Sequence, residues 1–196
     1  REMGMGGFFM HPRTGLDTEY LGAEFMECVA ACAERAAELG LHAWLYDEDR
    51  WPSGYAGGLL TRDAPECRER YLLFTPRPYA PTPPGAAQPS ASVGQTDGRE
   101  WPLERNDRGR LLARYYIRLD TDGCLEHSRR LREDDPAPAD PGAVWYAYLE
   151  IQEPCAGWNH ATLGDVLNPA AARRFIALTH ERYAARVGRH FGDTIP

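Results

Sequence analysis

Lysine is absent from this chain, and arginine supplies all 22 basic side chains. With 29 acidic residues the net charge is −7, which argues against a nucleic-acid partner because affinity for phosphates depends mainly on basic charge. No apolar run approaches the roughly 20 residues that a membrane-spanning helix needs. The composition therefore predicts neither a nucleic-acid nor a membrane partner.

Cysteine is scarce and follows no zinc-like spacing. The five cysteines are Cys28, Cys32, Cys67, Cys124 and Cys155. We interpret them as small buried side chains of a protein from a reducing cytoplasm, with a metal or redox use of Cys28 and Cys32 as the alternative. Phosphate-loop, dinucleotide-binding and zinc-protease motifs are also absent, so no metal or cofactor is predicted.

The N-terminal part predicts a strand, a helix and a second strand. Residues 6–11 form a short apolar run closed by Pro12, and residues 41–46 form another. Between them a helix is expected after the N-cap Thr18, ending at Gly40. Its predicted buried stripe comprises Leu21, Phe25, Cys28, Val29, Cys32, Ala36 and Leu39. This order predicts a βαβ unit with parallel strands, assigned to residues 1–64.

Residues 65–157 predict a β-rich insertion. Strands are expected at 111–119 and 144–151, with a turn at 121–124. The segment 79–98 is rich in proline, glycine, alanine and serine, which is typical of a long surface loop.

A returning helix is predicted in residues 158–196. Asn168 is a good N-cap and Pro169 a good first helical residue, and Gly188 ends the pattern. The expected buried stripe is Ala172, Phe175, Ile176, Thr179, Tyr183 and Val187.

Polar clusters follow both N-terminal strands, at the carboxyl ends where α/β folds bind ligands. Carboxylates accept hydrogen bonds from sugar hydroxyls and aromatic faces stack on sugar rings, so the clusters predict a carbohydrate site. The candidate substrate-binding residues are His11, Arg13, Tyr46, Asp47, Glu48, Asp49, Trp51, Ser53 and Tyr55. Gly54, Gly57 and Gly58 are expected to take positive φ and approach the ligand closely.

Several alternatives remain open at this point. The three acids could form a solvated loop or a first helical turn, and His11 could be a core histidine. His160, after the insertion, could reach the same rim. His11 with Asp47 and Asp49 could instead hold a divalent metal for hydrolysis.

The strings GFFMHPRTGL (7–16) and AWLYDEDRWPSGYAGG (43–58) resemble a family of bacterial glycoside hydrolases. These are related to the α-L-rhamnosidase-type (β/α)₈ enzymes, and FIALTHERY (175–183) and GDTIP (192–196) resemble the same family. The resemblance implies an α/β fold, namely a partial (β/α)₈ TIM-barrel segment with a β-rich insertion. Relatives are thought to bind calcium, but no ligands can be assigned here.

The resemblance also implies hydrolysis of O-glycosidic bonds by a larger parent protein. Glycoside hydrolysis needs two placed carboxylates. Glu48 and Asp47 are the catalytic candidates, and the general acid is expected beyond Pro196, where the chain stops before the next strand. The rival hypothesis is a carbohydrate-binding protein without catalysis.

Overall fold

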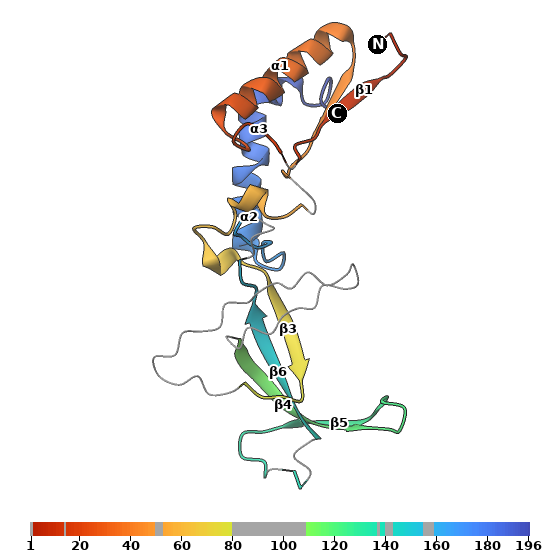
Figure 1. Cartoon of the computed structure of the whole chain (residues 1–196), viewed down its shortest axis with the longest axis vertical. Helices are drawn as coiled ribbons and strands as arrows, with labels where there is room; N and C mark the ends of the chain where they lie inside the picture. The colour runs from red at the N-terminus through yellow and green to blue at the C-terminus, as the bar shows by residue number, and fades with distance from the viewer. Residues whose placement is uncertain are drawn as a thin grey trace. The chain divides into compact units, whose positions relative to one another are not determined.

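The computed structural model describes residues 2–13, 15–49, 53–79, 109–136, 138–139, 143–154 and 159–196. They form two compact units (Figure 1). Unit 1 comprises Arg1–Arg68 and Ala156–Pro196, and unit 2 comprises Glu69–Cys155, so unit 2 interrupts unit 1 in sequence. Within these ranges, every helix is too short or too polar to cross a membrane.

Unit 1 begins with the predicted βαβ unit. Strand β1 (Gly7–Met10) and strand β2 (His42–Leu45) are parallel neighbours, with Phe9 opposite Trp44. Helix α1 (Ala23–Leu39) connects them and ends at Gly40, which adopts the left-handed conformation typical of a helix C-cap. These findings confirm the strand–helix–strand order and the helix stop, whereas the partial barrel remains a prediction.

The start and the buried stripe of α1 differ from the prediction. The N-cap is Gly22 and not Thr18, because the chain turns first at Leu21, where φ is 59°. The buried positions of α1 are Phe25, Met26, Val29, Ala30, Ala33 and Ala36. Cys28 and Cys32 lie outside this narrow arc and are exposed, so the interpretation of both as buried side chains is wrong. Cys124 is exposed as well, whereas Cys67 is buried.

The returning helix is divided in two. Asn168 caps α2 (Pro169–Leu178) by accepting a hydrogen bond from the Ala170 N–H at 3.0 Å, as predicted. Helix α3 (His180–Val187) follows after a break at Thr179, whose hydroxyl donates to the Phe175 carbonyl at 2.7 Å. The expectation of one continuous helix is therefore wrong, and with it the burial of two members of its stripe, Ala172 and Ile176. Short 3-10 turns also occur at Ala56–Gly58, Pro65–Cys67 and Gly188–His190.

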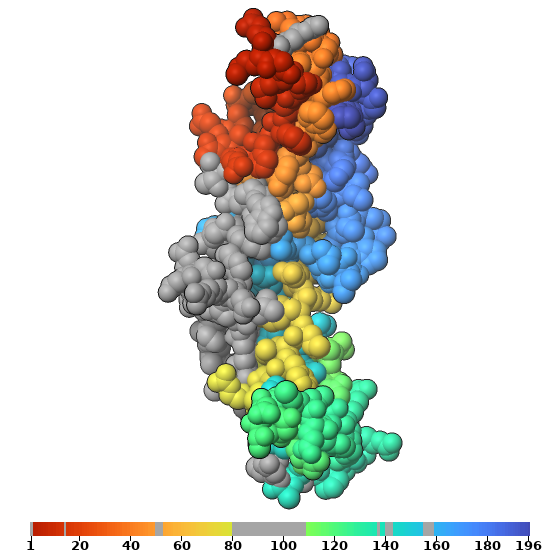
Figure 2. Space-filling view, turned by 90° about the vertical axis from the view of Figure 1, so that its right-hand side faces the viewer, coloured from red at the N-terminus to blue at the C-terminus, as the bar shows by residue number. Residues whose placement is uncertain are grey.

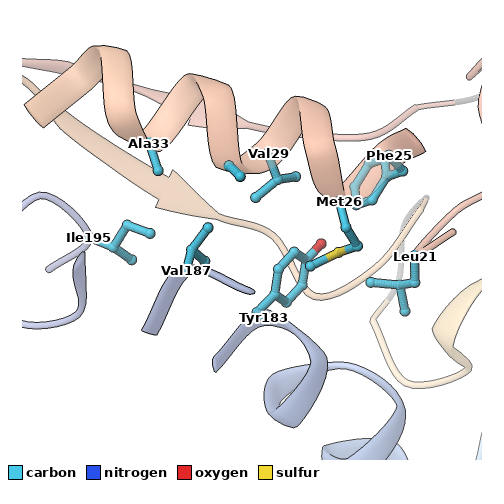
Figure 3. Close-up of a cluster of buried hydrophobic side chains, with 9 residues drawn as sticks. Leu21, Phe25, Met26, Val29, Ala33, Tyr183, Val187 and Ile195 are labelled. Carbon is cyan, nitrogen blue, oxygen red and sulfur yellow. The ribbon is translucent and has the colours of Figure 1, made fainter. Parts of the chain in front are cut away.

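The core of unit 1 lies between α1 and α3. Figure 3 shows Phe25, Met26, Val29 and Ala33 pointing from α1 toward Tyr183, Val187 and Ile195. Residues near the C-terminus also continue along the outer edge of β2, because the Ala43 N–H donates to the Thr194 carbonyl at 2.8 Å. This packing holds the strand ends in place.

Unit 2 is an antiparallel sheet in the order β3-β6-β4-β5. Its strands are β3 (Arg70–Thr75), β4 (Arg110–Leu119), β5 (Leu125–Leu131) and β6 (Val144–Ile151). The two predicted strands are confirmed as β4 and β6, and the predicted turn joins β4 to β5. Strand β3 was not predicted, although its sequence RYLLFT is an apolar run of strand length. Most of the loop predicted at 79–98 lies outside the described residues.

Candidate functional site

The carboxyl ends of β1 and β2 lie side by side, as the sequence predicts. Met10 pairs with Leu45, so the next residues of the two strands meet, and the His11 ring stacks on Tyr46 with ring centroids 3.9 Å apart. The Tyr46 carbonyl accepts a hydrogen bond from the Tyr183 hydroxyl at 3.0 Å. The strand ends are therefore anchored to α3 before the two loops diverge.

Glu48, the middle acid of the triplet, is 0% exposed. Its carboxylate accepts hydrogen bonds from the backbone N–H of Asp49 and from four successive residues of the following loop. These four are Gly54 at 3.2 Å, Tyr55 at 3.0 Å, Ala56 at 2.7 Å and Gly57 at 2.5 Å. The carboxylate thus satisfies amides that would otherwise be buried without partners.

The backbone of this loop is shaped to surround the Glu48 carboxylate. The three glycines predicted to take positive φ do so, with φ of 129° at Gly54, 61° at Gly57 and 94° at Gly58. Successive N–H groups in such conformations form a concave anion-binding nest. Burial raises the pKa of Glu48, and the backbone amides oppose this shift by stabilising the anion. The anion that the glycine loop binds is a side chain of the protein itself.

Asp49 is fixed by a second set of hydrogen bonds. One carboxylate oxygen accepts from the Tyr55 hydroxyl at 2.9 Å and the other from the Asn159 side-chain amide at 3.2 Å. Asn159 also donates to the Gly57 carbonyl at 3.0 Å. Asn159 therefore connects the start of the returning segment to the acidic loop, 110 residues earlier.

A polar hollow of about 260 Å³ opens beside Asp49. Its walls come from the loop after β1, the loop after β2 and Asn159. The lining residues are Arg13, Gly15, Leu16, Thr18, Glu19, Tyr20, Asp49, Gly57, Leu59, Arg62 and Asn159. The hollow lies beyond the carboxyl ends of two parallel strands, where α/β folds bind ligands.

The charges around the hollow are balanced. Arg13 and Arg62 provide two guanidinium groups, and Glu19 and Asp49 provide two carboxylates. Tyr20 also lines the hollow, but its hydroxyl is buried, and burial together with the nearby Tyr183 and acidic side chains raises the pKa of that hydroxyl. Donors and acceptors without a net charge suit a neutral ligand with many hydroxyl groups.

The hollow includes only part of the predicted site. Arg13 and Asp49 line it, whereas Ser53 is exposed away from the lining and Trp51 lies outside the described residues. Asp47 is half-buried and also absent from the lining, as are the stacked His11 and Tyr46.

Glu48 and Tyr55 need correction. Both are buried, and their polar atoms bind the loop and Asp49, so neither is placed to contact a ligand. The interpretation of the acids as a solvated loop is likewise wrong for Glu48 and Asp49, which are 0% and 7% exposed.

Sequence reasoning missed five polar or aromatic residues of the hollow. They are Thr18, Glu19, Tyr20, Arg62 and Asn159. Thr18 was interpreted as a helix cap, and the others had no signal in their local sequence. His160, the neighbour of Asn159, is the residue of this segment that could have reached the rim, but it does not line the hollow.

The alternative metal site has no geometric support. Within the described part of the chain, no three histidine, cysteine or acidic side chains lie close enough to hold a metal together. His11, Asp47 and Asp49, which that alternative required, therefore do not form such a group. No family model, curated protein or solved structure matches the chain.

Proposed function

We propose that the hollow of unit 1 binds one sugar ring, and that the chain is the sugar-binding part of a rhamnosidase-like glycoside hydrolase. The observation that carries the proposal is the hollow itself, with two guanidinium groups, two carboxylates and the amide of Asn159 around about 260 Å³ at the strand ends. Sugar hydroxyls can donate hydrogen bonds to such carboxylates and accept them from such guanidinium and amide groups.

The supporting groups are held in position before any ligand arrives. Tyr55 and Asn159 orient the Asp49 carboxylate, and the nest around Glu48 fixes the backbone that carries both Asp49 and Gly57. Preorganisation of this kind reduces the entropy that binding loses. Glu48 thus acts as a positioning residue and is no longer a catalytic candidate.

Binding can be measured by titrating the chain with methyl α-L-rhamnoside and other methyl glycosides, using saturation-transfer NMR. We expect Arg62→Ala and Asn159→Ala to weaken binding about tenfold, which corresponds to the loss of one hydrogen bond to a charged or oriented partner. Arg173→Ala, an exposed arginine of α2, is the matched control and should leave binding unchanged. Equal binding by all three variants would contradict the proposed site.

Hydrolysis needs a separate measurement, because binding of a sugar does not itself show that an acid and a base act on its glycosidic bond. Two carboxylates on opposite sides of a glycosidic bond lie about 5 to 10 Å apart. Asp49 and Glu19 are the acids at the hollow, with Asp47 close by in the chain. We expect aryl glycosides, rhamnosides included, to be cleaved by the parent protein that contains this chain.

The second candidate function is carbohydrate binding without catalysis. It is favoured by the hydrogen bonds that Asp49 accepts from Tyr55 and Asn159, since these give the carboxylate a structural role. Saturable binding of a glycoside, with no cleavage of any aryl glycoside by the parent protein, would select this candidate.

A further inference from the structure

A second and larger hollow, of about 960 Å³, lies within unit 2. Strand β5 ends at Leu131, which pairs with Arg114, so the first residues of β4 extend beyond their partner. Leu112 is the extra residue of a bulge at this point in β4. The unpaired edge of β4 and the chain that leaves β5 therefore enclose open space. Figure 2 shows β4 and β5, in green, at the molecular surface.

The far wall of this hollow is held by Arg114. Its guanidinium donates to the Arg132 carbonyl at 3.0 Å and to the Glu133 carbonyl at 3.3 Å. This contact fixes the segment after β5 against β4. The hollow is thus a formed feature of the β4–β5 hairpin, bounded on both sides by ordered backbone.

The hollow is positively charged although the chain is acidic. Three arginines, Arg114, Arg130 and Arg132, line it against one acid, Glu133. Arg130 and Arg132 are exposed, and neither guanidinium forms an ion pair or hydrogen bond with another described residue. The guanidinium groups of both arginines are therefore available to a ligand. Such groups bind carboxylates in a bidentate manner.

An aromatic surface continues from Arg130 across the sheet. Arg130 pairs with Tyr115, and Tyr115 pairs with Trp145, so the three side chains lie in one row on one face. Phe74 packs beside both rings, with centroids 5.7 Å from Tyr115 and 5.1 Å from Trp145, and it is 43% exposed. Strands β3, β4 and β6 contain one acid, Glu150, whose register places it on the opposite face.

We propose that this surface of unit 2, the hollow together with the row from Arg130 to Trp145, binds a carboxylated oligosaccharide. The arginines bind carboxylates of the chain, and the aromatic rings pack against the C–H faces of its sugar rings. The volume suits several sugar units, whereas the hollow of unit 1 suits one. Nucleic acid is the alternative polyanion, and an oligonucleotide is therefore included in the experiment.

The experiment compares two hexasaccharides that differ only in their carboxylates. Isothermal titration calorimetry of the whole chain uses a β-1,4-glucuronate hexamer and cellohexaose. A single-stranded hexanucleotide is the third ligand. We expect the glucuronate hexamer to bind at least tenfold more tightly than the other two. The affinity should fall as salt increases, because the contacts are ionic.

Variants then locate the site. Arg130→Gln and Arg132→Gln should each weaken glucuronate binding about tenfold, the loss expected for one charge-assisted contact. Arg118→Gln removes an exposed arginine of β4 that is paired with Glu126 outside the hollow, and it should change nothing. Asn159→Ala, in unit 1, should also leave this affinity unchanged, which separates this site from the proposed sugar site there.

Four results would overturn the proposal. The first is equal affinity for the neutral and the carboxylated hexamer, and the second is equal or tighter binding of the oligonucleotide. The third is an affinity for glucuronate that the two arginine variants leave intact, and the fourth is no saturable binding at millimolar ligand. Circular dichroism of each variant establishes that it is folded before its affinity is compared.

Discussion

Glu48 of unit 1 and Glu126 of unit 2 are both glutamates that bind cationic or polar donors, yet only Glu48 is removed from water. Five backbone amides enclose the Glu48 carboxylate, while Glu126 forms an ion pair with Arg118 at 2.9 Å in which both side chains are more than half exposed. Unit 1 therefore uses acidic charge internally to shape a loop. Unit 2 also buries one acid, Glu150, but it exposes Glu126 and most arginines of β4 and β5, where they can meet a ligand.

The comparison shows that the local density of charge does not by itself indicate a catalytic site. Three consecutive acids in unit 1 suggest a catalytic site in the sequence, but the central one, Glu48, binds the backbone amides of the following loop. The three arginines of the second hollow come from β4, from β5 and from the residue after β5, and the fold brings them together. Substitutions that remove one kind of interaction in each unit can test this contrast.

The largest effect is expected for Glu48→Gln. The glutamine amide would direct an N–H₂ group at two or three backbone donors, so we expect unit 1 to lose about 4 kcal/mol of stability. Hydrogen exchange of the α1 amides in increasing urea measures unit 1 separately from unit 2. Glu126→Gln is the matched control, measured by hydrogen exchange of the β4 amides. It should lower the stability of unit 2 by less than about 0.5 kcal/mol. Similar losses for the two variants would contradict the nest.

The second effect concerns glycines that share positive φ but differ in their surroundings. An added Cβ at Gly57 would lie 2.8 Å from Cδ1 of Tyr20, whereas one at Gly123, in the β4–β5 turn, would meet nothing within 4 Å. Gly57→Ala combines strain with overpacking and should cost about 3 kcal/mol. Gly123→Ala adds only the conformational cost of about 1 kcal/mol. Urea denaturation measures the free energy of unfolding of both variants. Equal losses would mean that the Tyr20 ring moves away from the added methyl group at little cost.

The third effect is a pH dependence that belongs to unit 1. Burial raises the pKa of Tyr183 to about 12, so the folded state retains a proton that the unfolded chain releases near pH 10. The stability contributed by Tyr183 is therefore complete below pH 10 and is lost as the pH rises toward 12. At pH 11 the loss should reach about 1.4 kcal/mol. Tyr183→Phe should reduce this dependence in urea titrations between pH 8 and pH 11 and leave the part contributed by Tyr20, whose pKa is also raised by burial. An unchanged slope would exclude Tyr183 as a source.

The parts of unit 1 that the sequence predicts are those determined by local interactions. The order of β1, α1 and β2 follows from apolar periodicity, and the positive φ of Gly54 and Gly57 follows from the freedom of glycine. What the glycine loop encloses could not be predicted, because the position of Glu48 inside it depends on the φ angles of the whole loop. Adjacent strand ends were predictable, and two of the residues singled out there, Arg13 and Asp49, line one hollow.

The remaining parts of the site depend on contacts between distant residues. Asn159 reaches Asp49 and Gly57 only because the two segments of unit 1, which unit 2 separates in the sequence, pack together, and its sequence context carries no sign of this. The break at Thr179 has a similar origin. Its hydroxyl can bind the Phe175 carbonyl in any helix, but the packing of Tyr183 against α1 decides where α3 points. Periodicity alone therefore predicted one helix where the fold has two.

The smallest effect should come from the surface ion pair of unit 2. The side chains of Arg118 and Glu126 are 58% and 53% exposed, so water screens their attraction and ordering both long side chains costs entropy. A double-mutant cycle with Arg118→Gln and Glu126→Gln should give a coupling energy below about 0.5 kcal/mol, falling further in 0.5 M salt. A coupling energy as large as the loss of stability expected for Glu48→Gln would mean that exposure does not decide how strongly a carboxylate stabilises its unit. A small value would mean that this exposed pair contributes little to the stability of unit 2, in contrast to the buried carboxylate of Glu48 in unit 1.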